Sequence, residues 1–127
     1  MAILDKIYYV ARLDILPGRR ADAEQAMREL AAFVEVVEPQ LLVYHFYVDQ
    51  AGATMTVLAL HPDAASLELH LELGGPKFRT FVPLARMRSV DVYGNPGPDA
   101  LDRLHGLAEL LGGAPVTVHT RLAGFTR

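Results

Sequence analysis

Two histidines, His61 and His70, are the side chains of this sequence best suited to proton chemistry. They lie in the stretch ALHPDAASLELHLELGGPKF, residues 59–78, where a strand is predicted to end at His61 and a helix to carry His70. A neutral histidine can accept a proton near pH 7, because its ordinary pKa is about 6.5. A structural role fits as well, with His61 fixed by Pro62 and His70 bonded to a backbone carbonyl.

The spacing of these histidines does not indicate a metal site. They form neither an HxH nor an HxxxH pair, and the chain has no cysteine to supply a thiolate ligand. The remaining histidines, His45, His105 and His119, are scattered. Neither a glycine-rich phosphate-binding loop nor a GxSxG nucleophile motif is present. We therefore expect no metal and no cofactor.

Four aromatic residues could line a small-molecule pocket: Tyr9, Tyr44, Phe78 and Phe81. An apolar cavity with few polar groups is the usual form of such a site. The same residues could simply fill the core. We predict them as substrate-binding residues, and His70 with His61 as catalytic residues.

Composition sets the class of protein. The chain has 127 residues, of which 51% are hydrophobic and 21% charged, with a net charge of −3. This is the length of one domain, 1–127, and its weak acidity favours neither a nucleic-acid nor a membrane partner. The N-terminal MAILDKIYYV does not have the pattern of a signal peptide. We expect a cytoplasmic protein.

Periodicity predicts the elements that position these residues. Alternating or β-rich runs predict strands over 7–15, 41–49, 54–60 and 86–93, whereas apolar residues at three- and four-residue steps predict helices over 20–37, 64–73 and 77–84. Asp63 is expected to cap the second helix, and Gly74-Gly75-Pro76 to interrupt it.

The order β-α-β-β-α-β predicts an α+β, ferredoxin-like fold, in which two helices pack on one face of an antiparallel sheet. This core spans 7–93. An extension over 97–127 should add a helix capped by Asp99 and running through Leu111, and then a strand within 115–122. The extension is too short for a second domain, so it must dock on the core or on a partner subunit.

The other face of the sheet is predicted to be bare and partly apolar, carrying Tyr8, Val10, Val90 and Val92. An exposed apolar face of this kind marks an interface, and a two-fold homodimer through the sheet would cover it. Arg86 and Arg88 would share this face and could pair with Asp14 or bind an anion.

The two stretches from Val10 to Asp49 and from Thr56 to Phe81 resemble the antibiotic biosynthesis monooxygenase-like family, whose members form dimeric α/β barrels. The likeness rests on a strand entering Pro17-Gly18, a helix ending at Glu38-Pro39, and a tyrosine-bearing strand around Tyr44 and Tyr47. It continues in a strand leading to Asp63 and a helix with His70 before a proline and Phe78.

The resemblance implies cofactor-free oxygenation of polycyclic phenols, quinol oxidation or, in one branch, haem degradation. The haem-degrading branch uses an asparagine, a tryptophan and a histidine at the positions of Ala11, His61 and Val82, so none of the three matches here. The chain has no tryptophan at all, although many monooxygenase members carry one. His70 occupies a position where members commonly have a histidine.

These observations favour a cofactor-independent monooxygenase-like protein that acts on a small aromatic or polyketide-like compound, with His70 as the main proton-transfer residue. A non-catalytic protein of the same fold that binds a small ligand or a partner is the alternative. A cofactor-free isomerase or lyase would use the same cavity without oxygen.

Overall fold

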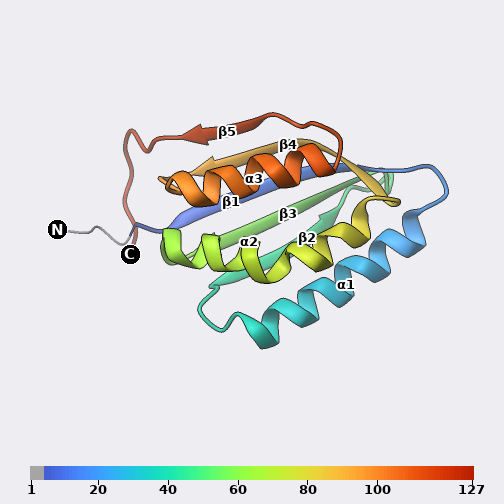
Figure 1. Cartoon of the computed structure of the whole chain (residues 1–127), viewed down its shortest axis with the longest axis horizontal. Coiled ribbons are helices and arrows are strands. Elements are labelled where there is room, and N and C mark those ends of the chain that lie inside the picture. Colours follow the sequence, from blue (N-terminus) through green and yellow to red (C-terminus); the bar gives the residue numbers. More distant parts are fainter. Residues whose placement is uncertain (1–4) are drawn as a thin grey trace.

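The computed structural model describes residues 5–127 (Figure 1). Nine elements follow one another: β1 (Ile7–Ile15), α1 (Arg20–Val37), β2 (Val43–Val48), β3 (Thr54–His61), α2 (Ala64–Phe78), a 3₁₀ turn (Arg79–Phe81), β4 (Ala85–Tyr93), α3 (Pro98–Leu110) and β5 (Val116–His119). The four strands predicted for the core and the first helix are confirmed, with bounds that differ by at most two residues; the last strand is confirmed as well, within its predicted range.

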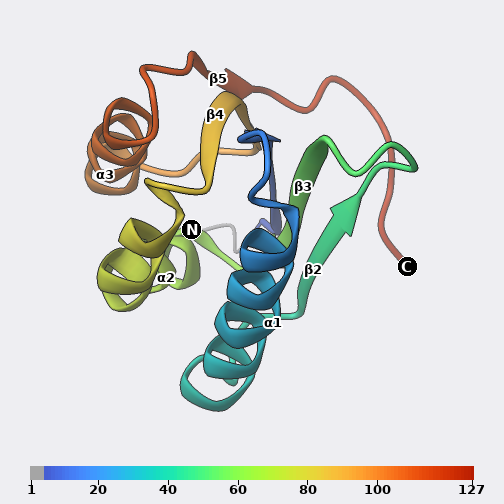
Figure 2. The same cartoon turned by 90° about the vertical axis from the view of Figure 1, so that its right-hand side faces the viewer.

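The five strands form one sheet in the order β2-β3-β1-β4-β5. All neighbours are antiparallel except β4 and β5, which run parallel. The three helices lie on the same face of this sheet, and no helix of residues 5–127 covers the other face (Figure 2). The fold is ferredoxin-like, as predicted, with an added helix and edge strand.

Burial of one stripe explains why α1 packs where it does. Ala23, Met27, Leu30 and Val34 are buried against the sheet, at the spacing that puts them on one face of a helix. From β1, Tyr9, Ala11 and Leu13 point into the same layer. The core therefore lies between the helices and the sheet.

The predicted break at Gly74-Gly75-Pro76 is wrong, because α2 runs through all three residues to Phe78. Gly74 is needed inside the helix: a Cβ there would lie 2.4 Å from Cζ of Phe78. The missing side chain lets the Phe78 ring pack over the helix. The separate helix predicted over 77–84 is only the 3₁₀ turn Arg79–Phe81. The Asp63 cap is confirmed, since its carboxylate accepts a 2.9 Å bond from the Ser66 backbone N–H.

The C-terminal extension docks on its own core. α3 packs beside α2, and the Met87 backbone N–H donates to the Leu111 carbonyl at 2.8 Å. Asp99 does not cap α3 but lies in its first turn. Gly97, at φ 79°, occupies the N-cap position, and Pro98 is the first helical residue. Proline suits that position because its missing N–H would be unpaired anyway.

The uncovered sheet face differs from the prediction at two residues. Val90 and Val92 face the helices and are buried, because they stand opposite Ala11 and Tyr9. The cause is a bulge: Arg12 pairs with Ser89 but Leu13 with Met87, so one extra residue of β4 reverses which side chains face outward. Arg88 remains outside, where it pairs with Asp14 at 3.3 Å, as expected.

Candidate active site

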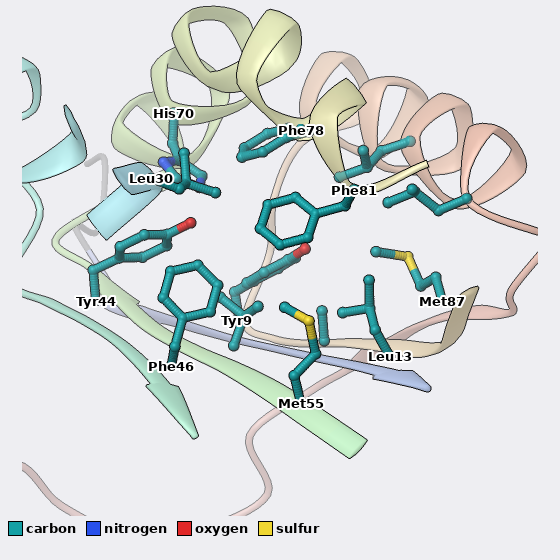
Figure 3. A pocket seen from close by; sticks show the side chains of 14 residues that line it. Tyr9, Leu13, Leu30, Tyr44, Phe46, Met55, His70, Phe78, Phe81 and Met87 are labelled. Carbon is teal, nitrogen blue, oxygen red and sulfur yellow. The ribbon is translucent and has the colours of Figure 1, made fainter. Parts of the chain in front are cut away.

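An apolar cavity lies between the sheet and the helices (Figure 3). Its volume is about 30 Å³, room for about two waters. It is lined by Tyr9, Ala11, Leu13, Leu30, Tyr44, Phe46, Met55, Val57, His70, Phe78, Phe81, Met87, Leu107 and Leu111. Three of these side chains carry a nitrogen or an oxygen: Tyr9, Tyr44 and His70.

His70 is held by a buried carboxylate. Glu38 Oε2 lies 2.8 Å from His70 Nδ1 and Oε1 lies 3.0 Å from it, while the two side chains are 0% and 2% exposed. Glu38 ends α1 just before Pro39, and its backbone leaves the helical region there, as the sequence predicted. The end of α1 thus places a carboxylate beside the second turn of α2.

This bond selects the tautomer of His70. A carboxylate only accepts, so Nδ1 carries the hydrogen and donates it to Glu38. Nε2 is left as the ring nitrogen that can accept a proton. Within residues 5–127, Nε2 has no hydrogen-bond partner. Because His70 lines the cavity, we take Nε2 to be open to that space.

The rings around His70 fix its orientation. Tyr44, Phe78 and His61 place their ring centroids 5.1, 5.4 and 5.4 Å from that of His70. Packed rings hold the imidazole from several sides and set the direction of Nε2 before a ligand binds. The bond to Glu38 sets the tautomer.

Tyr9 and Tyr44 point their hydroxyls into the cavity (Figure 3). Neither phenol oxygen bonds to another side chain or backbone group of the described residues. Burial raises the pKa of Tyr9 well above its usual value. Burial also raises the pKa of Tyr44, with the nearby Tyr9 and Glu38 adding to the effect. Both are therefore neutral phenols at pH 7, able to donate a hydrogen bond.

His61 does not line the cavity, although it is buried on the helix-facing side of β3. Its Nδ1 lies 2.8 Å from Ser66 Oγ, which accepts a 3.3 Å bond from Gln40 Nε2. Its Nε2 is the one fully enclosed side-chain nitrogen or oxygen of residues 5–127 without a partner. Burial, and secondly His70, lower the pKa of His61 to about 3, so the ring is neutral.

The structure thus brings five of the six predicted site residues to one cavity: Tyr9, Tyr44, His70, Phe78 and Phe81. Glu38 was not predicted as a site residue, only as the end of a helix. One signal could have found it. Glu38 continues the buried stripe of Leu30 and Val34 at four-residue steps, and a charged residue in such a stripe needs a partner.

Two further findings bear on ligands and location. Residues 5–127 contain no group of three histidines, cysteines or acids placed to hold a metal ion. Among those residues, no helix has the length and apolar character needed to cross a membrane.

Comparison with known proteins gives structural likeness but no family assignment. No protein-family model matches the chain, and no curated protein matches its sequence. MupZ from Pseudomonas fluorescens is similar in structure, with 25% identity over 96% of this chain and 94% of its own, at a TM-score of 0.69. That coverage leaves only about five residues of this chain unmatched, so it extends into the C-terminal extension.

Two other structures share the fold at lower identity. SnoaB, a cofactor-independent oxygenase from Streptomyces nogalater, is 16% identical over 74% of this chain and 96% of its own, with a TM-score of 0.62. A Bacteroides thetaiotaomicron protein described as a proposed antibiotic biosynthesis monooxygenase is 18% identical over 69% of this chain and 85% of its own, with a TM-score of 0.57. The chain has the fold of these monooxygenase-like proteins.

Proposed function

We propose that this chain is a cofactor-independent monooxygenase-type enzyme for a small aromatic or polyketide-like compound, with His70 as its general base. The observation that carries the proposal is the buried Glu38–His70 pair beside an apolar cavity. A histidine whose second nitrogen is bonded to a carboxylate is a familiar arrangement for proton abstraction. The fold shared with a cofactor-independent oxygenase supports the same reaction class.

The proton chemistry follows from the bond to Glu38. His70 Nε2 would take a proton from an acidic C–H or O–H of the substrate, and the ring would become an imidazolium. Glu38 stabilises that cation through Nδ1–H without itself taking the proton. The low polarity of the lining strengthens this interaction, because there is little water to screen it.

The substrate anion would then react with oxygen. For an activated methylene, the carbanion gives its electrons to O₂, a C–O bond forms, and a hydroperoxide results after protonation by His70. Loss of water from the hydroperoxide gives the ketone, so that R₂CH₂ and O₂ become R₂C=O and H₂O. Oxygen is the oxidant and no other electron carrier is required.

Anthrone is a suitable test compound, since loss of its methylene proton gives an aromatic anion. We expect the protein to consume one O₂ for each anthraquinone formed, measured with an oxygen electrode and by chromatography. His70→Ala should abolish this activity with the fold intact by circular dichroism. His105→Ala, at an exposed position on α3, is the matched control and should retain it. Activity that persists in His70→Ala would refute the assignment.

The small cavity favours a second candidate, a protein that binds a small apolar ligand without converting it. The cavity volume is only about 30 Å³, so a ring-sized ligand requires lining side chains to move. Ligand binding without oxygen uptake or any product would support this candidate. Conversion under strict exclusion of oxygen would instead indicate an isomerase or lyase that uses the same base.

We also propose a homodimer through the uncovered sheet face. Tyr8, Tyr47 and Tyr93 are 50%, 52% and 42% exposed there. Ion pairs on the same face, Arg12–Asp91 and Arg88–Asp14, are exposed and contribute little to stability by themselves. A second copy would cover the aromatic side chains.

A further inference from the structure

Tyr9 and Tyr44 are the two cavity groups that proton abstraction by His70 leaves without a role. We propose that they form a two-donor subsite for one substrate oxygen, on which negative charge develops when His70 removes a proton. The substrate class is then a neutral ketone with an acidic neighbouring C–H, or a phenol. This inference rests on the proposed function, because it assigns the oxygen side of the same reaction.

The sheet register places the two tyrosines in one row, on either side of Ala59. Ala59 of β3 stands opposite Tyr9 of β1 on one side and opposite Tyr44 of β2 on the other. The three residues form one row across neighbouring strands, and side chains in such a row point to the same face of the sheet. Ala59, fully buried and small, leaves the space above it to the two phenols.

The hydroxyl groups are poised to donate. Both point into the cavity (Figure 3), and neither makes a hydrogen bond to another of residues 5–127. A buried hydroxyl without a partner is unfavourable unless a ligand or water satisfies it. Because an oxyanion is a stronger acceptor than a carbonyl oxygen, two phenols aimed at it stabilise the anion more than the starting ketone.

The rest of the lining restricts the ligand's charge. Apart from Tyr9, Tyr44 and His70, the cavity is lined by aliphatic, aromatic and thioether side chains. Among residues 5–127 no lysine or arginine lines it, so a carboxylate or phosphate would be buried without a counter-charge, which is strongly unfavourable. A neutral compound that becomes anionic only as its proton moves to His70 Nε2 fits this lining. In a ketone the neighbouring C–H bond breaks and its electron pair is delocalised onto the oxygen held by the phenols. In a phenol the O–H bond breaks and the electron pair stays on that oxygen.

A coloured phenol tests the subsite without knowledge of the substrate. The phenolate of 4-nitrophenol absorbs at longer wavelength than the neutral form, so absorbance reports the ionisation of the bound probe. Titrations over a pH series should show the bound phenol ionising at least tenfold more readily than in solution. Tyr9→Phe and Tyr44→Phe should each weaken phenolate binding by about 10- to 100-fold, as expected for the loss of a hydrogen bond to a charged group.

Two controls isolate the effect. Tyr47→Phe makes the same change on β2 at an exposed position and should bind phenolate like the unmodified protein. The methyl ether 4-nitroanisole cannot ionise, so its affinity should be equal in all four proteins. Thermal unfolding should show Tyr9→Phe and Tyr44→Phe folded and no less stable, because each removes an unpaired hydroxyl.

The outcomes separate this inference from the proposed function. Failure of the probe to bind, binding of the neutral phenol only, or phenolate binding that survives both Tyr→Phe changes would overturn the subsite. In a His70→Ala background, phenolate binding above the probe's solution pKa should be weaker because the imidazolium is absent, but Tyr9→Phe or Tyr44→Phe should lower it further by about 10-fold. If that holds while anthrone consumes no oxygen, the subsite stands and the oxygenase proposal fails.

Discussion

Glu38 and His70, separated by 32 positions in the sequence, meet in the core with Oε2 of the carboxylate 2.8 Å from Nδ1 of the ring. Neither side chain has more than 2% of its surface exposed. Two polar groups at this depth are tolerable because each satisfies the other, and the loss of either one would leave a buried polar group unpaired. The relationship therefore makes predictions about both stability and turnover.

Removing the carboxylate should affect both properties. We expect Glu38→Ala to lower the free energy of unfolding by about 3 kcal/mol, since His70 then lacks its partner. Turnover in the anthrone assay should fall by about 10²- to 10⁴-fold, because the tautomer and direction of His70 are no longer fixed. Urea denaturation and the oxygen electrode measure the two effects.

A double-mutant cycle tests whether the two residues act as a pair. The unfolding free energy lost in Glu38→Ala combined with His70→Ala should be smaller than the sum of the two single losses by at least about 0.5 kcal/mol. Glu35→Gln, at an exposed position on the same helix, is the control and should change neither property. Strictly additive losses would contradict the coupling.

His61 should make stability depend on acidity. Its pKa in the folded protein, about 3, lies below the ordinary value of 6.5, chiefly through burial. Between these values the unfolded chain binds a proton that the folded chain does not, so this group's contribution is complete above about pH 6.5 and is lost as the pH falls. One such group changes the free energy of unfolding by at most about 1.4 kcal/mol per pH unit.

His61→Asn removes this titration and isolates it from that of the carboxylates. At pH 7 the variant should be less stable than the unmodified protein, because the imidazole packing is lost. At pH 4.5 the difference in the free energy of unfolding between the two proteins should be smaller by about 2 kcal/mol than at pH 7, as measured by urea denaturation at both pH values. His105→Asn should show no such change, since His105 is exposed. A difference that is the same at both pH values would contradict the buried neutral state.

The fold could be predicted from the sequence because most elements have a clear local period. The alternation in 7–15 and the three- and four-residue steps in 20–37 determine which faces are buried. The failures lie where tertiary contacts override local preference. Gly74 and Pro76 are helix-breaking by type, yet the packing of Phe78 over Gly74 keeps α2 continuous.

The site was predicted only in part, because tertiary contacts determine some of its members. Tyr9 and Tyr44 were expected to line a pocket and do so, but Val90 and Val92 were assigned to the wrong face, because no local sequence pattern indicates the bulge opposite Arg12. Glu38 was not predicted as a site residue because its partner, His70, lies in another helix 32 positions away, and only the tertiary fold brings the two together. The catalytic and binding roles remain predictions for experiment.

The C-terminal helix should set the size of ligand that the cavity accepts. Leu107 and Leu111 come from the end of α3 and close one side of the cavity. Leu107→Ala should raise the affinity for 2-naphthol relative to 4-nitrophenol several-fold, and lower the free energy of unfolding by about 2 kcal/mol. Leu110→Ala truncates a more exposed leucine of the same helix that does not line the cavity, so its probe preference should be unchanged. Equal preferences in the two variants would show that α3 is not a wall of the site.

The uncovered sheet face should hold two copies together. Val10 is a suitable probe, because it faces outward from the central strand β1, between Leu58 of β3 and Asp91 of β4. Light scattering at micromolar concentration should give twice the chain mass of 13.9 kDa. Val10→Arg would place an unpaired charge in the middle of a closed interface, so it should yield a folded monomer. Val36→Arg adds the same charge at a site that is 78% exposed on α1 and should remain dimeric. A monomeric mass for the unmodified protein would contradict the homodimer, and the exposed tyrosines of this face would then need another partner.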